Sequence, residues 1–193
     1  MDVNSQKIQL EELNPWKKLK QEKVYESPWI SVEHHDVLNP AGNPGTYSVV
    51  RFKNLAIGII PLDDDDNTYM VGQYRFPFDE YSWEIPEGGG DREVNPLESA
   101  KRELLEECGI IANDWQLIQQ MQTSNAATDE YCYIFVAKDL TFTNSQPEEN
   151  EQLLVRKIPF EQLYDLVNSG AITDSLSVAG VLRAKLLQME GKL

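Results

Sequence analysis

An acidic segment between residues 95 and 109 contains the first candidate residues for a metal-binding or catalytic site. Glu103 and Glu107 are four residues apart, so on a helix they share one face as a like-charged pair. Two carboxylates one helical turn apart suit a hard divalent cation, which prefers oxygen ligands. Arg102 stands four residues before Glu106 and can pair with it. A glutamate-rich helix by itself is more often a solvated face, so the neighbouring residues must decide.

The ends of this helix are marked in the sequence. Asn95 is a good N-cap, Pro96 suits the first helical position, and Gly109 supplies a left-handed stop. Leu97, Ala100, Leu104 and Cys108 fall on one stripe and should face the core. The sequence therefore predicts a helix over residues 96–108 with its carboxylates away from that stripe.

Residues 88–110 resemble the sequence box of the Nudix hydrolases, Gly-x5-Glu-x7-Arg-Glu-U-x-Glu-Glu-x-Gly-U, where U is apolar. Gly88 and the run over residues 102–110 match at the family's spacing. The first glutamate of the box falls on Val94, with Glu93 directly before it. Residues 25–29, 73–75, 83–88 and 149–151 resemble the ADP-ribose pyrophosphatase, or nucleoside diphosphate sugar hydrolase, branch. The resemblance thus covers nearly the whole chain.

The resemblance implies a bound Mg²⁺ (or Mn²⁺). Its ligands would be the carboxylates of Glu103 and Glu107 and the main-chain carbonyl of Glu87, with Glu151 completing the site from a distant loop. Metals held by clustered carboxylates neutralise a diphosphate, polarise its phosphorus and lower the pKa of a bound water.

Catalytic roles follow from the same resemblance. Glu149 would be the general base, although spacing alone leaves Glu151 equally possible and Glu148 a weaker third. Glu106 would hold an outer position, bound through water or paired with Arg102.

Candidates for substrate contacts lie on both sides of the box. Arg51 and Arg75 could grip the phosphates, because arginine binds them in a bidentate manner; a surface salt bridge is the alternative for Arg51. Trp29 and Tyr25 could stack on a base, although packing or a subunit contact is the commoner fate of such aromatics. Gly88 is a further candidate for a substrate contact.

The composition limits the function classes. The 193 residues carry 17 Lys and Arg against 32 Asp and Glu, a net charge of −15. Such a field repels phosphate backbones and anionic lipid, so nucleic-acid and membrane partners are not expected. An anionic substrate therefore needs local cations. Two cysteines, Cys108 and Cys132, are too few for a disulfide scaffold and suit reduced thiols. With no apolar leader at the N-terminus, we expect a cytoplasmic protein.

The remaining patterns predict the elements that must position these residues. Expected strands cover residues 23–25, 30–37, 46–52, 116–122, 131–137 and 153–158, a hairpin joins 55–61 to 68–74 across the solvated aspartates 63–66, and helices cover 160–167 and 175–189. We predict an N-terminal β-strand region over residues 1–50 and a Nudix domain over 51–193. The latter should be an α/β/α sandwich with a mixed sheet. The N-terminal strands are too few to fold alone, so a homodimer is expected.

The expected reaction is hydrolysis of ADP-ribose to AMP and ribose 5-phosphate. GDP-mannose or another nucleoside diphosphate sugar is the alternative, because the proline that ADP-ribose enzymes of this family commonly carry downstream of the box is absent from residues 124–127. A third hypothesis is a non-hydrolytic nucleotide sensor, since such domains usually lose box glutamates and Val94 replaces one.

Overall fold

The computed structural model describes residues 14–145 and 153–193. The chain forms two compact units, Met1–Arg51 and Phe52–Leu193. Among the described residues, no helix is long and apolar enough to cross a bilayer.

The first unit is a three-stranded sheet in the order β1-β2-β3. Its strands are β1 (Lys17–Glu26), β2 (Ile30–Leu38) and β3 (Pro44–Phe52). β1 is longer than the predicted strand and pairs with β2 in antiparallel register. The turn between β2 and β3 is closed by the Asn39 side chain, which accepts hydrogen bonds from the main-chain N–H groups of Ala41 and Asn43. Gly42 supplies the positive φ that this turn requires.

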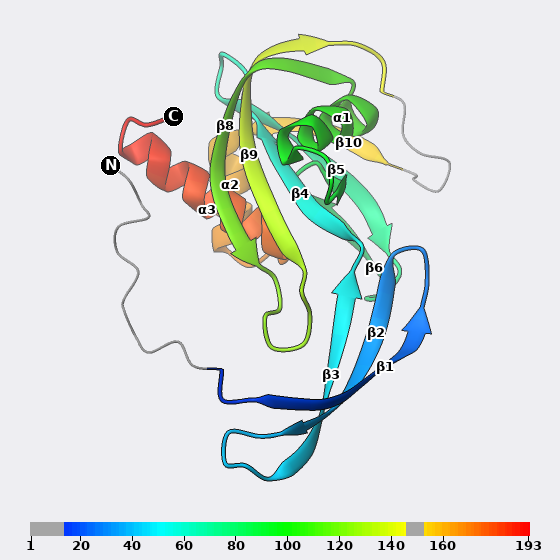
Figure 1. Cartoon of the computed structure of the whole chain (residues 1–193). Coiled ribbons are helices and arrows are strands. Elements are labelled where there is room, and N and C mark those ends of the chain that lie inside the picture. Colours follow the sequence, from blue (N-terminus) through cyan, green and yellow to red (C-terminus); the bar gives the residue numbers. More distant parts are fainter. Residues whose placement is uncertain (1–13, 146–152) are drawn as a thin grey trace. The chain divides into compact units, whose positions relative to one another are not determined.

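The second unit contains a four-stranded mixed sheet in the order β7-β4-β9-β8. Its strands are β4 (Asn54–Pro61), β7 (Glu87–Asp91), β8 (Ile110–Gln122) and β9 (Tyr131–Phe142). β4 runs parallel to β9, and the other pairs are antiparallel. Helix α1 (Pro96–Cys108) covers one face, while α3 (Ser175–Met189) covers the other with α2 (Phe160–Asn168) beside it (Figure 1). The sandwich predicted from the sequence is confirmed.

Alternate residues of β4 supply both layers of the core, as strand geometry requires. Ile57 and Ile59 pack in one cluster with Leu104 of α1, whereas Ile60 packs in another with Val181 of α3. Burial on both faces explains the continuous apolar run of this strand.

A second sheet holds β5 (Asn67–Arg75) between β10 (Leu154–Pro159) and β6 (Glu80–Glu84). The predicted hairpin between β4 and β5 is therefore wrong, because the two strands belong to different sheets. The connection crosses between the sheets at Leu62, which is buried and donates its N–H to the carbonyl of Ala137. Nearness in sequence suggested pairing, but tertiary contacts overrode it.

The aspartate run in this connection is only partly a solvated tip. Asp64, Asp65 and Asp66 are exposed. Asp63 is not: its carboxylate accepts N–H groups from Asp65 and Asn67 and pairs with Lys157 at 2.6 Å. The Asp63 side chain therefore stabilises this turn from its buried side.

Helix α1 begins and ends where the sequence predicts. The Asn95 side chain accepts the N–H of Leu97, and Gly109 adopts φ 64°. Besides Ala100 and Leu104, the helix also buries Ser99, Glu103 and Glu107. Part of its polar side is therefore inside the protein.

Strand β7 runs through the glycine run over residues 88–90, where the sequence predicted no strand. It pairs with β4, with Gly88 opposite Ile57 and Gly90 opposite Leu55. A Cβ on Gly90 would lie 2.9 Å from the Ile57 side chain and 3.1 Å from Ser99 Oγ of α1. Glycine is required here because helix and strand approach closely, which strand propensity alone does not reveal.

Candidate functional site

Glu103 and Glu107 are buried against the main chain of β7. Their exposed fractions are 8% and 2%. Glu107 Oε2 accepts a hydrogen bond from the main-chain N–H of Glu87 at 3.0 Å. A Cβ on Gly88 would lie 2.2 Å from the carboxyl carbon of Glu103, so only glycine leaves room for this carboxylate. Two box glutamates, Gly88 and the main chain of Glu87 thus meet at one place.

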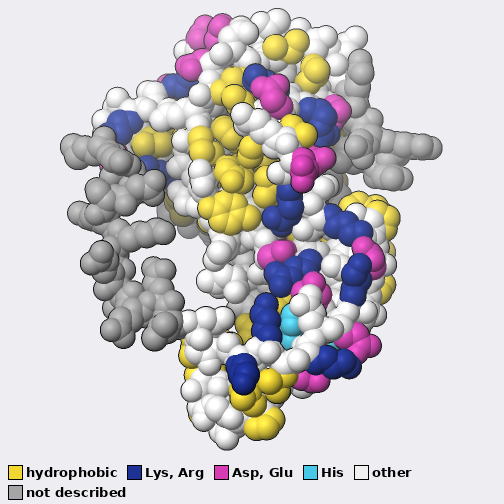
Figure 2. Space-filling view, in the orientation of Figure 1, with side chains coloured by type: hydrophobic (Ala, Val, Ile, Leu, Met, Phe, Trp, Pro, Cys, Tyr) yellow, Lys and Arg dark blue, Asp and Glu magenta, His cyan; other side chains and the backbone are white. Residues whose placement is uncertain are grey.

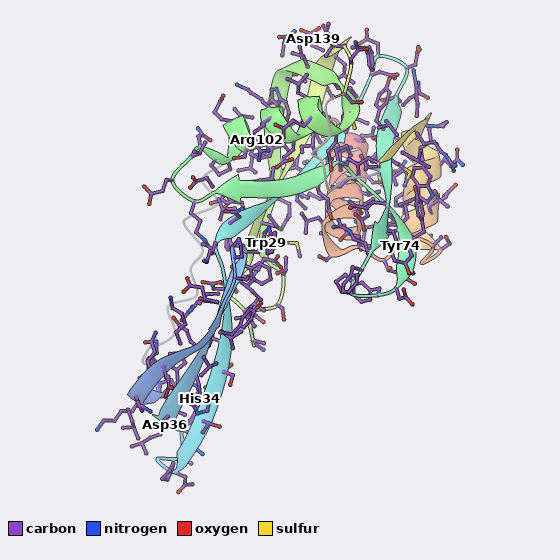
Figure 3. The ribbon with its side chains drawn as sticks, turned by 90° about the vertical axis from the view of Figure 1, so that its right-hand side faces the viewer. Trp29, His34, Asp36, Tyr74, Arg102 and Asp139 are labelled. Atoms are coloured by element: carbon purple, nitrogen blue, oxygen red, sulfur yellow. The ribbon has the colours of Figure 1, made fainter. Side chains whose placement is uncertain are left out.

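Arg102 ties this face of α1 to β7. Its guanidinium donates to Glu106 Oε2 at 2.6 Å, to Glu103 Oε1 at 2.5 Å and to the main-chain oxygen of Gly89 at 2.7 Å. The ion pair with Glu106 was expected from the spacing. The contacts with Glu103 and Gly89 show that Arg102 also holds a buried carboxylate in position. Figure 3 shows the side chain projecting from α1.

A second carboxylate group lies on the other side of Glu87. One oxygen each from Glu84, Glu87 and Asp174 lie within 4.8 Å of one another. Arg75 donates Nε to Glu84 Oε1 at 2.9 Å and also binds Glu87. The main-chain N–H of Glu87 faces Glu107 while its side chain faces Arg75, so this residue joins the two groups.

The electrostatics of this second group follow from its burial. The Glu84 side chain is 3% exposed and that of Glu87 is 12% exposed. Burial raises the pKa of Glu87 well above its usual range, and the charges of Asp174 and Glu84 raise it further. Burial alone would lower the pKa of Arg75, but its hydrogen bonds with Glu84 and the charge of Glu87 raise it instead. Arg75 is therefore held as a permanent cation.

The donor set fits a hard divalent cation. Glu103 and Glu107 offer carboxylate oxygens one helical turn apart, beside a main-chain segment, and such oxygens are what Mg²⁺ and Mn²⁺ prefer. Two like-charged carboxylates buried this deeply need compensating positive charge, of which Arg102 supplies part.

Other predicted residues lie elsewhere. Glu148, Glu149 and Glu151 fall outside the described residues. Val94, at the position of the first box glutamate, is 43% exposed in the turn before α1. The preceding residue, Glu93, donates its main-chain N–H to Asp91 Oδ1. The first box position therefore faces solvent in this chain.

Three predicted substrate residues belong to the first unit. Trp29 and Tyr25 are 70% and 55% exposed. Arg51 Nε donates to Glu33 Oε2 at 3.0 Å, so its side chain takes part in an ion pair within this sheet.

Sequence reasoning missed Glu84, Asp174 and the side chain of Glu87. Glu84 lies inside the Trp83–Pro86 segment, but nothing in the spacing linked it to Arg75. Asp174 did carry a signal, because an aspartate directly before an apolar helical run is a typical N-cap. It accepts the N–H of Ser177 at 2.7 Å at the start of α3.

Family models match both units. The model of the NUDIX domain matches residues 52–175, and these include the buried glutamates of α1. The chain belongs to the Nudix family. The model described as the nucleoside diphosphate sugar hydrolase N-terminal domain matches residues 16–50.

Relatives agree with this Nudix assignment. The chain is 30% identical over 156 residues to an ADP-ribose pyrophosphatase of Mycobacterium tuberculosis, covering 79% of this chain and 75% of that protein. It is 28% identical over 161 residues to an ADP-ribose pyrophosphatase of Bacillus subtilis, covering 82% and 86%. A crystal structure described as ADP compounds hydrolase shares the fold, with a TM-score of 0.82, 24% identity and coverage of 94% of this chain and 98% of that one. This chain is a Nudix hydrolase similar to ADP-ribose pyrophosphatases.

Proposed function

We propose that this Nudix hydrolase splits the diphosphate bond of a nucleoside diphosphate sugar, with ADP-ribose, giving AMP and ribose 5-phosphate, as the leading substrate. The observation that carries the proposal is the buried pair Glu103 and Glu107 against the main chain of Glu87 and Gly88. The N-terminal match to nucleoside diphosphate sugar hydrolases and the names of the two relatives support the substrate class.

Metal binding is part of this proposal. Glu103, Glu107 and the main-chain carbonyl of Glu87 would hold Mg²⁺ or Mn²⁺, and the bound ion would neutralise the diphosphate and lower the pKa of the attacking water. Arg102 keeps Glu103 in place from α1. Glu106, paired with Arg102, stays outside the direct ligands.

The protein's own groups would do the remaining work. Arg75, fixed by Glu84 and Glu87 and 34% exposed, offers a permanent positive charge for one phosphate. Glu149 or Glu151 would take the proton of the attacking water, a role that rests on the family resemblance. Arg51 would grip the second phosphate, and Trp29 and Tyr25 would stack on the base.

Two alternatives have specific support. Residues 124–127 lack the proline that ADP-ribose enzymes commonly carry, so another nucleoside diphosphate sugar such as GDP-mannose is the second candidate. A nucleotide sensor is supported only by Val94, whereas the glutamates of α1 are all retained.

A product assay tests the proposal. Purified protein would be incubated with ADP-ribose, GDP-mannose, UDP-glucose, NADH and diadenosine polyphosphates, with Mg²⁺, with Mn²⁺ or with EDTA. We expect metal-dependent release of AMP from ADP-ribose that EDTA abolishes. Preference for GDP-mannose would keep the reaction and change the substrate. Tight nucleotide binding without turnover of any compound would reject hydrolysis and favour the sensor.

The homodimer and the cytoplasmic location predicted from the sequence belong to the same proposal. Apolar side chains on β1, such as Leu19 and Val24, are more than half exposed, which supports a subunit contact there. Light scattering after size exclusion should give twice the 22.0 kDa of one chain. A mass of one chain would reject the dimer.

A further inference from the structure

Strand β2 carries two histidine–carboxylate pairs on opposite faces. Glu33 and His35 point to one face, and His34 and Asp36 point to the other, because strand residues alternate. The His35 ring places Nε2 3.3 Å from Glu33 Oε2, and His34 Nε2 lies 3.7 Å from Asp36 Oδ1. Each pair therefore combines an imidazole ring with a carboxylate group on the same strand.

Their burial differs strongly. The side chains of His35 and Glu33 are 3% and 16% exposed, whereas those of His34 and Asp36 are 41% and 51% exposed. Figure 3 shows His34 and Asp36 side by side on the N-terminal sheet. Screening by water makes the exposed pair weak, whereas the buried pair is shielded from water.

The buried pair is connected to Arg51 on β3. Glu33 Oε2 accepts the hydrogen bond from Arg51 Nε at 3.0 Å, and this bond is the main reason why the pKa of Glu33 lies below its usual value. The register places Lys23 of β1 opposite Glu33. The Lys23 ammonium binds Glu26 at 2.6 Å. In Figure 2, Lys and Arg side chains alternate with Asp and Glu over these strands.

We propose that Glu33, supported by His35, is a positioning residue that sets the plane of the Arg51 guanidinium for a phosphate of the substrate. The inference rests on the proposed function, in which Arg51 binds that phosphate. An arginine side chain has several rotatable bonds, and a hydrogen bond at Nε fixes the plane in which its remaining N–H groups lie. Pre-orientation of this kind reduces the ordering that substrate binding must otherwise supply.

His35 is a polar side chain buried in a sheet with little core. Two residues of the described part of the first unit are buried, His35 and Val37. Its imidazole lies beside the carboxylate that accepts the hydrogen bond from Arg51.

A double-mutant cycle tests the proposal. We would measure kcat and KM for ADP-ribose with Mg²⁺ in the wild type, Glu33→Gln, Arg51→Ala and the combined variant. Because Glu33→Gln keeps an acceptor but removes the charge that strengthens its hydrogen bond with Arg51, it should raise KM about tenfold with little change in kcat. Because Glu33 acts through Arg51, Glu33→Gln should add nothing in the Arg51→Ala background. His35→Gln should raise KM by a smaller factor, about threefold, since it acts one contact further away.

His34→Gln and Asp36→Asn are the matched controls, because they remove the same chemistry from the other face of β2 and should leave KM unchanged. Thermal melting of every variant would detect loss of folding, and Glu33→Asp would replace Glu33→Gln if the latter melts early. Equal KM increases in both backgrounds would mean a structural role and overturn the proposal, as would an unchanged KM in Glu33→Gln.

The proposed function and this inference can fail separately. Binding of inorganic pyrophosphate by calorimetry provides a readout that needs no turnover, and the same cycle of variants should show the same coupling. Absence of hydrolysis with that coupling retained would reject only the proposed reaction. An Arg51→Ala protein with wild-type KM and wild-type pyrophosphate affinity would overturn the inference even if hydrolysis is observed.

Discussion

The two units differ in charge and in burial. Residues 1–51 contain six Lys or Arg and seven Asp or Glu, whereas residues 52–193 contain 11 and 25, so the net charges are −1 and −14. The second unit has a continuous core on both faces of its mixed sheet. In the first, His35 and Val37 are buried among the described residues, while Trp29, Tyr25 and Val24 are more than half exposed.

Together with the proposed function, this contrast predicts a division of labour, with catalysis in the second unit and substrate affinity in the first. Carboxylates that could hold a metal belong to the unit with the larger buried core, where Arg102 contacts Glu103 and Gly88 leaves room for it. A unit of charge −14 repels an anionic substrate at long range. In the proposed function, the nearly neutral N-terminal unit would supply aromatic side chains and Arg51 for substrate contacts without adding to that repulsion. Changes in the second unit should therefore affect turnover and folding, and changes in the first should affect substrate affinity.

The largest expected effect is on turnover. Glu107→Gln removes a charge from the pair on α1 while preserving shape, so kcat should fall at least about 100-fold. Initial rates with ADP-ribose and Mg²⁺ would measure it. Glu98→Gln is the control on the same helix, because Glu98 pairs with Lys101 at the surface, and its kcat should be unchanged. Near-wild-type turnover in Glu107→Gln would end the assignment of this pair as the metal site.

The next prediction compares how much protein stability is lost when each of two leucines is truncated to alanine. Leu104 is fully buried on α1, so Leu104→Ala should lower the free energy of unfolding by about 2–5 kcal/mol. Leu19 on β1 is 55% exposed within one chain, so Leu19→Ala should cost a monomer less than about 0.5 kcal/mol, and a larger loss is expected only where the proposed dimer buries this side chain. Urea unfolding would give both values. A large loss at Leu19 would show that this side chain is buried in the assembled protein and would support the dimer.

The sequence predicted α1 and its neighbours well because their signals are local. Asn95, Pro96 and Gly109 define the helix through contacts within one or two turns, and the box spacing identified Glu103 and Glu107. Strand β7 was missed because glycine has low strand propensity, and its use here depends on the approach of Glu103 and Ser99 from α1.

Contacts between distant segments could not be predicted in the same way. Asp174 meets Glu84 and Glu87 only after α3 has packed on the sheet, about 90 residues further along the chain. The same limit explains the wrong hairpin between β4 and β5: each strand pairs with partners far away in sequence, β4 with β9 and β5 with β10. No local pattern encodes these choices.

A smaller effect is expected for substrate affinity in the first unit. Base stacking on an aromatic side chain predicts that Trp29→Ala raises KM for ADP-ribose about tenfold and leaves kcat unchanged. Its melting temperature should hardly change, because the side chain is 70% exposed. Trp16→Ala is the control: this ring packs edge-to-face on Tyr47, so its loss should affect melting more than KM. A fall in kcat in Trp29→Ala would contradict the division of labour.

The smallest expected effect is the pH-dependent contribution of Asp63 to the stability of the second unit, which its exposed neighbours should not make. Burial would raise the pKa of Asp63, but hydrogen bonds from Lys157 and Asn67 lower it from 3.8 to about 2. A carboxyl group with a lowered folded pKa stabilises the fold above its unfolded value, so this contribution is complete above about pH 4 and disappears as the pH falls towards 2. Asp63→Asn should lose about 1–2 kcal/mol at pH 7.

Unfolding in urea at a series of pH values from 7 to 2 would measure this contribution. The difference in the free energy of unfolding between wild type and Asp63→Asn should be constant at neutral pH and shrink between pH 4 and 2. Protonation of Asp63 removes the carboxylate charge from the wild type, and the substitution has already removed that charge from the variant. Asp64→Asn is the matched control, since Asp64 is exposed in the same turn and should follow the wild-type curve. Parallel stability curves for wild type and Asp63→Asn would contradict this prediction, because Asp63 would then behave like the exposed acids of the surface. In that case, the turn before β5 would contain no carboxylate that stabilises the fold.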